Sequence, residues 1–75
     1  MYAVNIGHGD YLCTGSYIVH GEKYQIVGDI ANARIFKTWD AAKNWVERLQ
    51  ETRANVNEYT IIDLAFINQD KKARQ

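Results

Sequence analysis

The sequence contains no proline and only one cysteine, Cys13, among its 75 residues. A single cysteine excludes a disulfide within the chain, leaves pairing between two chains open, and fits a reducing compartment. The longest apolar runs are a few residues, and the first residues lack the charged and apolar regions of a signal peptide. We therefore expect a cytoplasmic protein that neither spans a membrane nor is secreted.

The sequence also lacks an excess of charge, because nine Lys and Arg residues balance nine Asp and Glu residues. Binding to nucleic acid through phosphates depends on excess positive charge, so this balance argues against a nucleic-acid partner. Lys71, Lys72 and Arg74 do cluster near the end, and we interpret residues 69–75 as a polar, solvated tail. Residues 1–68 form the single predicted domain, because so short a chain has room for only one small core.

Alternation of apolar and polar residues predicts three strands in the first half of the chain. The predicted strands cover residues 2–6, 11–19 and 24–30. A glycine-rich turn at residues 7–10 and a second turn at residues 20–23 separate them, because glycine supplies the positive-φ conformations that turns need. Residues 31–36 fit either one helical turn or an irregular crossover.

The clearest predicted element is one amphipathic helix that begins after Thr38. Thr38 is a favourable N-cap residue, and Asp40 lies in the first turn, where the helix dipole stabilises negative charge. Five apolar residues at helical spacing form a stripe that we expect to lie on the sheet: Trp39, Ala42, Trp45, Val46 and Leu49. A last strand at residues 59–67 is rich in β-branched and aromatic residues. The prediction is an α+β fold in which an antiparallel β-meander of three strands, one helix packed on the sheet and a final strand follow in the order β-β-β-α-β.

Side chains alternate along a strand, so the helix is expected to cover one face of the sheet and leave the other open. We assign to the covered face Tyr2, Val4, Ile6, Tyr11, Cys13, Tyr17, Val19, Tyr24, Ile26 and Ile30. We assign to the open face Ala3, Asn5, Leu12, Thr14, Ser16, Ile18, Gln25, Val27 and Asp29. The last strand is apolar on both faces: Ile62, Leu64 and Phe66 can face the helix, while Ile61, Ala65 and Ile67 point to the open face.

The open face therefore carries an apolar patch, and such patches tend to mark contact sites. The predicted partner-binding residues are Leu12, Ile18, Val27, Ile61, Ala65 and Ile67. A bulge at Gly15 would reverse part of this pattern, and isolated aliphatic residues are common on protein surfaces. The patch is a hypothesis that depends on the assignment of the faces.

Four residues resemble parts of a catalytic or metal site: His8, Asp10, Cys13 and His20. Their spacing matches no structural zinc pattern, and the glycine-rich segments make the histidines and the aspartate ordinary polar turn residues. Cys13 is predicted on the covered face, where cysteine behaves as a small hydrophobic residue and not as a nucleophile. We therefore expect no catalytic residue, no bound metal, no cofactor and no enzymatic activity.

Residues 33–42 read Ala-Arg-Ile-Phe-Lys-Thr-Trp-Asp-Ala-Ala, and the amphipathic helix and the last apolar strand follow them. This stretch resembles an A-x-x-F-x-T-x-x-x-A pattern seen in many small phage and prophage proteins of unassigned function. Such proteins often act by binding host or phage proteins, including as inhibitors of bacterial defence nucleases. The resemblance implies a binder in the cytoplasm of a host cell and names no target.

These observations predict a small non-catalytic protein-binding module that sterically blocks a larger host protein. Two alternatives remain open. A nucleic-acid-binding accessory domain would stack bases on its tyrosines, but we assign Tyr2, Tyr11, Tyr17 and Tyr24 mainly to the core and its rim. A structural homodimer would gain stability by self-association through the same patch or through an unpaired strand edge.

Overall fold

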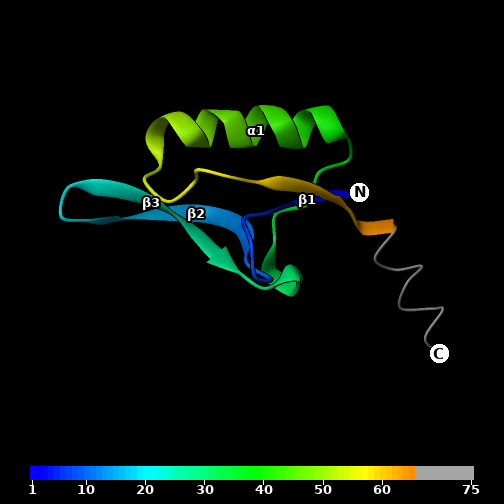
Figure 1. The fold of residues 1–75 in the computed structure, drawn as a ribbon, viewed down its shortest axis with the longest axis horizontal. Helices are drawn as coiled ribbons and strands as arrows, with labels where there is room; N and C mark the ends of the chain where they lie inside the picture. Colours follow the sequence, from blue (N-terminus) through cyan, green and yellow to red (C-terminus); the bar gives the residue numbers. More distant parts are fainter. Residues whose placement is uncertain (66–75) are drawn as a thin grey trace.

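The structure, a computed structural model, describes residues 1–65 and is a four-stranded sheet with one helix packed on it (Figure 1). The strands are β1 (Tyr2–Asn5), β2 (Tyr11–Val19), β3 (Glu22–Gly28) and β4 (Thr60–Asp63). The helices are the short 3-10 helix η1 (Ile30–Asn32) and the α-helix α1 (Trp39–Thr52). All pairings are antiparallel and the strand order is β3-β2-β1-β4, so the predicted β-β-β-α-β fold is confirmed.

Helix α1 begins as its sequence predicts. The hydroxyl oxygen of Thr38 accepts a hydrogen bond from the backbone N–H of Ala41 at 3.1 Å. Four of the five predicted stripe residues are buried against the sheet: Ala42, Trp45, Val46 and Leu49. The fifth, Trp39, is 45% exposed because it is the first residue of the helix, and the Lys43 ammonium lies 5.1 Å from its ring centroid. The prediction that Trp39 lies on the sheet is therefore wrong.

The N-cap gives a direct test of how strongly this helix end is stabilised. Replacing Thr38 with alanine removes the side-chain acceptor and is expected to lower the free energy of unfolding by about 1 kcal/mol. Thr38→Ser keeps the hydroxyl and is expected to retain most of that stability. Urea unfolding followed by circular dichroism measures both variants. Equal free energies of unfolding for Thr38→Ala and Thr38→Ser would show that the hydroxyl at this position does not stabilise the helix.

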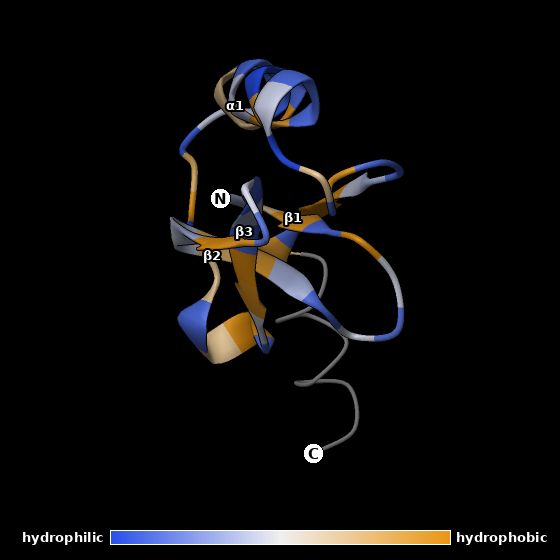
Figure 2. Ribbon diagram, turned by 90° about the vertical axis from the view of Figure 1, so that its left-hand side faces the viewer, coloured by the Kyte–Doolittle hydropathy of each residue, from blue (hydrophilic) through white to orange (hydrophobic). Residues whose placement is uncertain are grey.

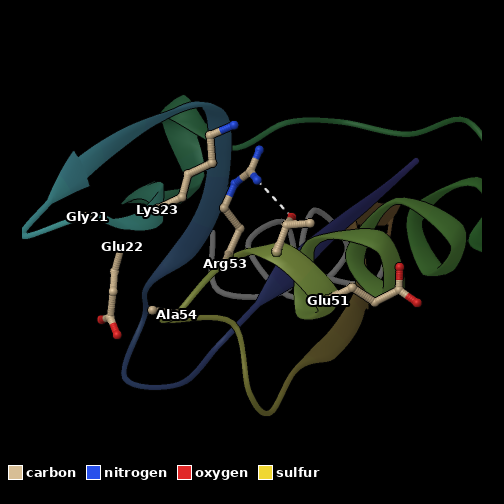
Figure 3. A pocket seen from close by; sticks show the side chains of 7 residues that line it. Gly21, Glu22, Lys23, Glu51, Arg53 and Ala54 are labelled. Atoms are coloured by element: carbon tan, nitrogen blue, oxygen red, sulfur yellow. Dashed lines mark hydrogen bonds between the residues drawn. The ribbon is translucent and has the colours of Figure 1, made fainter.

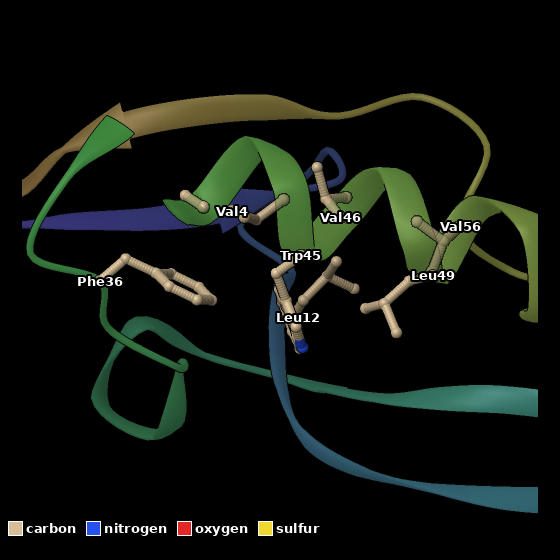
Figure 4. Close-up of a cluster of buried hydrophobic side chains, with 8 residues drawn as sticks. Val4, Leu12, Phe36, Trp45, Val46, Leu49 and Val56 are labelled. Atoms are coloured by element: carbon tan, nitrogen blue, oxygen red, sulfur yellow. The ribbon is translucent and has the colours of Figure 1, made fainter. Parts of the chain in front are cut away.

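The core lies between α1 and the sheet (Figure 4). Its buried members are Val4, Leu12, Phe36, Ala42, Trp45, Val46, Leu49 and Val56. Phe36 enters this layer because its backbone pairs with β1, where Phe36 and Tyr2 exchange two hydrogen bonds of 2.8 Å, while the Arg34 N–H donates to the Leu12 carbonyl of β2 at 3.0 Å. Its ring lies 5.2 Å from that of Trp45, and the Arg34 guanidinium lies 5.2 Å from the centroid of each ring. Residues 31–36, predicted as either one helical turn or an irregular crossover, contain both: η1, which begins at Ile30 and not within a strand as predicted, and then an irregular segment that supplies one wall of the core.

The two faces of β2 are reversed relative to the prediction. Asn5 lies directly opposite Tyr11, and residues that face each other across an antiparallel pair point to the same side. Tyr11 therefore shares the face of Asn5, away from α1, and Leu12 shares the face of Val4. Leu12 is 0% exposed within the core, so its predicted place on the open face is wrong.

An irregularity at Gly15 does not restore the predicted faces. Leu12 lies opposite Val27 and Ser16 opposite Gln25, so four steps along β2 match two along β3, and β2 carries two extra residues. An even insertion keeps the alternation in phase, which a single-residue bulge would not. Gly15 has φ +105°, a conformation that favours glycine.

Strand β4 is also reversed, because Val4 lies opposite Ile61 and Ala3 opposite Ile62. Ile61 therefore points toward α1 and is half-buried against the core, while Ile62 points away. The predicted strand at residues 59–67 is shorter in the structure: it ends at Asp63, and Leu64 and Ala65 adopt helical geometry. Predictions for Phe66, Ile67 and the tail at 69–75 fall outside the described residues.

Candidate protein-binding surface

A tight turn joins β2 and β3 into a long hairpin. Val19 lies opposite Glu22, so the loop consists only of His20 and Gly21, with φ angles of 50° and 81°. Two successive positive-φ residues suit the right-handed twist of a two-residue hairpin. The predicted four-residue turn is therefore half as long, and Glu22 and Lys23 belong to β3.

The face of this hairpin that points away from α1 is apolar and open. Strand pairing places Glu22 on this face together with four apolar or aromatic side chains, which we call the hairpin patch: Tyr17, Val19, Tyr24 and Ile26. Tyr17 is 48% exposed, and its ring stacks on that of Tyr24 with centroids 5.6 Å apart and planes 14° from parallel. Val19 and Ile26 are exposed and Tyr24 is half-buried. The sequence prediction had placed all four under the helix.

The arrangement of layers explains why the hairpin patch remains open (Figure 2). Helix α1 lies on one side of the sheet and η1 lies on the other. There η1 contacts β2, away from the hairpin tip. A carbon added at Gly28 would lie 3.2 Å from the Cys13 sulfur and 3.8 Å from the Asn32 side chain, so η1 shields the base of the hairpin. The tip receives no such cover within residues 1–65.

The six predicted partner-binding residues do not form one patch. Ile18 is 67% exposed and Val27 is also exposed, both on the side of the sheet that carries α1. Leu12 is in the core, Ile61 is half-buried on the far side of β1, and Ala65 is exposed beyond the end of β4. Ile67 lies outside the described residues. Alternation along β2 and β3 correctly places the four side chains of the hairpin patch on one face. It does not show whether α1 covers that face, because that depends on how the strands pair.

A polar cluster closes the outer edge of the hairpin where α1 ends. The backbone N–H of Gln25 donates to the Asn55 side-chain oxygen at 2.9 Å, and the Asn55 amide donates to the Gln25 carbonyl at 3.0 Å. Next to them, the backbone N–H of Ala54 donates to the Lys23 carbonyl at 2.9 Å. Residues 54–55 therefore act as a partner strand along part of β3, an edge strand that would otherwise be available for pairing.

The side chain of Gln25 is the only buried polar one in the described chain, at 2% exposure. Its amide donates to the Cys13 carbonyl at 2.6 Å, beside the irregular part of β2, and its oxygen accepts from the Arg53 Nε at 2.9 Å. Every buried polar group needs such partners, because an unpaired one costs stability. Gln25 was predicted on the open face, and its burial could not be anticipated without the position of Arg53.

The residues with potential for catalysis are dispersed. His8 and His20 adopt positive φ in two separate turns, as their interpretation as turn residues requires, and the Asp10 N–H donates to the Gly7 carbonyl at 2.9 Å. Cys13 is buried, and burial together with the negative charge of Asp29 raises the pKa of its thiol. In residues 1–65, no group of three or more His, Cys, Asp or Glu side chains could hold a metal ion.

No helix of the described chain is long and apolar enough to cross a membrane. Comparison with known proteins identifies no protein family that matches the sequence, no similar curated protein and no similar solved structure.

Proposed function

We propose that this protein is a non-catalytic binding module that uses the β2–β3 hairpin to cover a surface on a larger protein. One observation carries the proposal: the hairpin patch gathers two stacked tyrosines, a valine and an isoleucine on an open sheet face. Exposed apolar side chains that lie together mark contact sites more reliably than scattered ones. Aromatic residues are also enriched where proteins bind each other.

The surroundings of the tyrosines favour a protein partner over a nucleic acid. The Tyr24 hydroxyl donates to a Glu22 carboxylate oxygen at 3.1 Å, and this bond together with the negative charge raises the pKa of Tyr24. The carboxylate would repel phosphates, and one face of each ring is already occupied by the other ring. Base stacking requires free ring faces and basic neighbours.

The resemblance of residues 33–42 to small phage proteins supports a narrower form of the proposal. In that form the protein is encoded by a phage or mobile element and acts in the host cytoplasm. It inhibits a host protein, such as a defence nuclease, by steric blocking. A homodimer that buries the hairpin patch against its own copy is the competing proposal.

The test places a photo-crosslinking amino acid at position 17 in the full chain, expressed in the cells that naturally produce it. Position 47 on α1 serves as the control, because Glu47 is exposed on the opposite side of the molecule from the hairpin patch. We expect one heterologous protein to crosslink from position 17 and not from position 47. A product that contains only a second copy of this chain, or equal products from both positions, would overturn the proposal.

The crosslinked protein is then purified for affinity measurements with two matched variants. Ile26 and Ile35 have similar exposure, 39% and 44%, but only Ile26 lies in the hairpin patch. Ile26→Asp is expected to weaken binding at least about tenfold, equivalent to about 1.4 kcal/mol, because a charge replaces an apolar contact. Ile35→Asp should change the dissociation constant less than about twofold. Circular dichroism confirms that both variants are folded, and equal affinity of the two would contradict the assigned surface.

A further inference from the structure

The end of α1 meets the hairpin in a polar notch (Figure 3). Residues 21–23 and 51–54 line this notch. Two of its residues, Lys23 and Arg53, are cationic, and two, Glu22 and Glu51, are anionic. The way these four side chains are held decides what the notch can bind.

Arg53 is held in place by neutral partners. Its Nε donates to the Gln25 side-chain oxygen at 2.9 Å, and its Nη1 donates to the Thr52 hydroxyl at 2.8 Å. Gln25 is itself fixed in the buried cluster by its bond to the Cys13 carbonyl. Neither acceptor carries charge, so neither offsets the positive charge of the guanidinium, and within residues 1–65 the Nη2 group of Arg53 makes no hydrogen bond. A guanidinium fixed in this way is preorganised for a planar anionic acceptor.

Lys23 adds a second cation beside it. Its carbonyl is bonded to the N–H of Ala54, so the two backbones adjoin, and Lys23 shares a face of β3 with Gln25, the residue that holds Arg53. Figure 3 shows the Lys23 and Arg53 side chains extending in the same direction, whereas Glu22 and Glu51 point away from them. Glu22 lies on the opposite face of β3, where it accepts from Tyr24.

We propose that Lys23 and Arg53 bind a carboxylate from an acidic side chain of the partner protein. The inference rests on the proposed function and names one chemical feature of the partner. Lys23 and Arg53 present two positive charges to the same acceptor, and Glu51 on the rim of the notch favours a basic residue beside that acceptor. A continuous run of phosphates would be repelled by Glu51, so the pattern of charge fits a peptide in which a basic residue adjoins the acidic one.

The test uses the full chain and a defined probe, the peptide acetyl-Ala-Lys-Glu-Lys-Ala-amide, in an NMR titration. The Arg53 Nε–H and the Ala54 amide report on the notch. We expect saturable shifts with a dissociation constant on the order of millimolar, which is typical for a contact of a few atoms. The same peptide with Gln in place of Glu should bind at least about fivefold more weakly, because a neutral amide loses the charge-assisted bonds.

Matched variants localise the effect. Lys23→Gln is expected to weaken binding of the Glu peptide at least about threefold, and Lys23→Arg to preserve it. Arg48→Gln makes the same charge change on the outer face of α1 and should leave the titration unchanged. Equal binding of the Glu and Gln peptides, or equal losses for Lys23→Gln and Arg48→Gln, would overturn the proposal. So would tighter binding of a short oligothymidylate at Arg53, which would identify a nucleic-acid site.

The outcome is separable from that of the proposed function. Ile26→Asp changes the opposite face of β3 from Lys23, so it should weaken binding through the hairpin patch and leave the peptide titration intact. If the hairpin binds its partner but the notch does not distinguish Glu from Gln peptides, only the acidic contact is rejected.

Discussion

Leu12→Ala is expected to lower the free energy of unfolding by about 3 kcal/mol, the largest effect of any single truncation considered for this protein. Leu12 is completely buried in the core with Val4 and Trp45, so the truncation removes apolar contacts and leaves a cavity (Figure 4). A domain of this size has a total stability on the order of 4–11 kcal/mol, so the loss is a large fraction of it. Urea unfolding monitored by tryptophan fluorescence measures the shift in midpoint.

Ile18→Ala is the matched control for Leu12→Ala. Ile18 lies on the same strand and the same face, but it is 67% exposed because it is beyond the part of the sheet that the core covers. Its truncation is expected to cost less than about 0.5 kcal/mol, as for most surface substitutions. Equal losses for the two variants would contradict the register that places Leu12 under α1.

Asn55→Ala is expected to lower the free energy of unfolding by about 2 kcal/mol. The substitution removes two hydrogen bonds between the Asn55 side chain and the Gln25 backbone, each worth about 1 kcal/mol. It also reopens the β3 edge at this position. Hydrogen exchange at the Gln25 amide should accelerate strongly in the variant, because that N–H loses its acceptor.

Asn57→Ala serves as the control for the asparagine substitution. Asn57 is exposed, and its backbone carbonyl accepts a hydrogen bond from the Gln50 side-chain amide at 2.6 Å. The alanine variant keeps this carbonyl and therefore this bond. We expect little change in stability and none in the exchange of the Gln25 amide. Similar effects at both positions would show that the loop as a whole, and not the side chain of Asn55, protects the edge.

Leu12 and Asn55 both determine which parts of the hairpin are exposed. Burial of Leu12 fixes which face of the hairpin is open, and Asn55 keeps the edge of β3 from pairing with another chain. With Lys23 and Gln25 of this edge occupied, the open face of the hairpin is available to a partner where backbone pairing is not. This distinction favours side-chain recognition by the hairpin patch over strand addition at β3.

Local patterns in the sequence were sufficient for the elements and their order. The spacing of Ala42, Trp45, Val46 and Leu49 predicts the buried side of α1, and Thr38 predicts where it begins; both are confirmed. Turns at glycine-rich segments and alternating strands gave the β-β-β-α-β order. These features depend on residues within a few positions of each other, so no tertiary contact is needed to read them.

Only the tertiary structure decided which side chains of β2, β3 and β4 are buried. Alternation sorts the side chains of a strand into two sets but does not say which set meets the helix; the pairing of Asn5 with Tyr11 and of Val4 with Ile61 does. That choice buried Leu12, exposed Tyr17 and moved the candidate surface to the hairpin. The notch at Lys23 and Arg53 could not be predicted from the sequence either. These residues are 30 positions apart, and they come together through Gln25, whose burial has no local sequence signal.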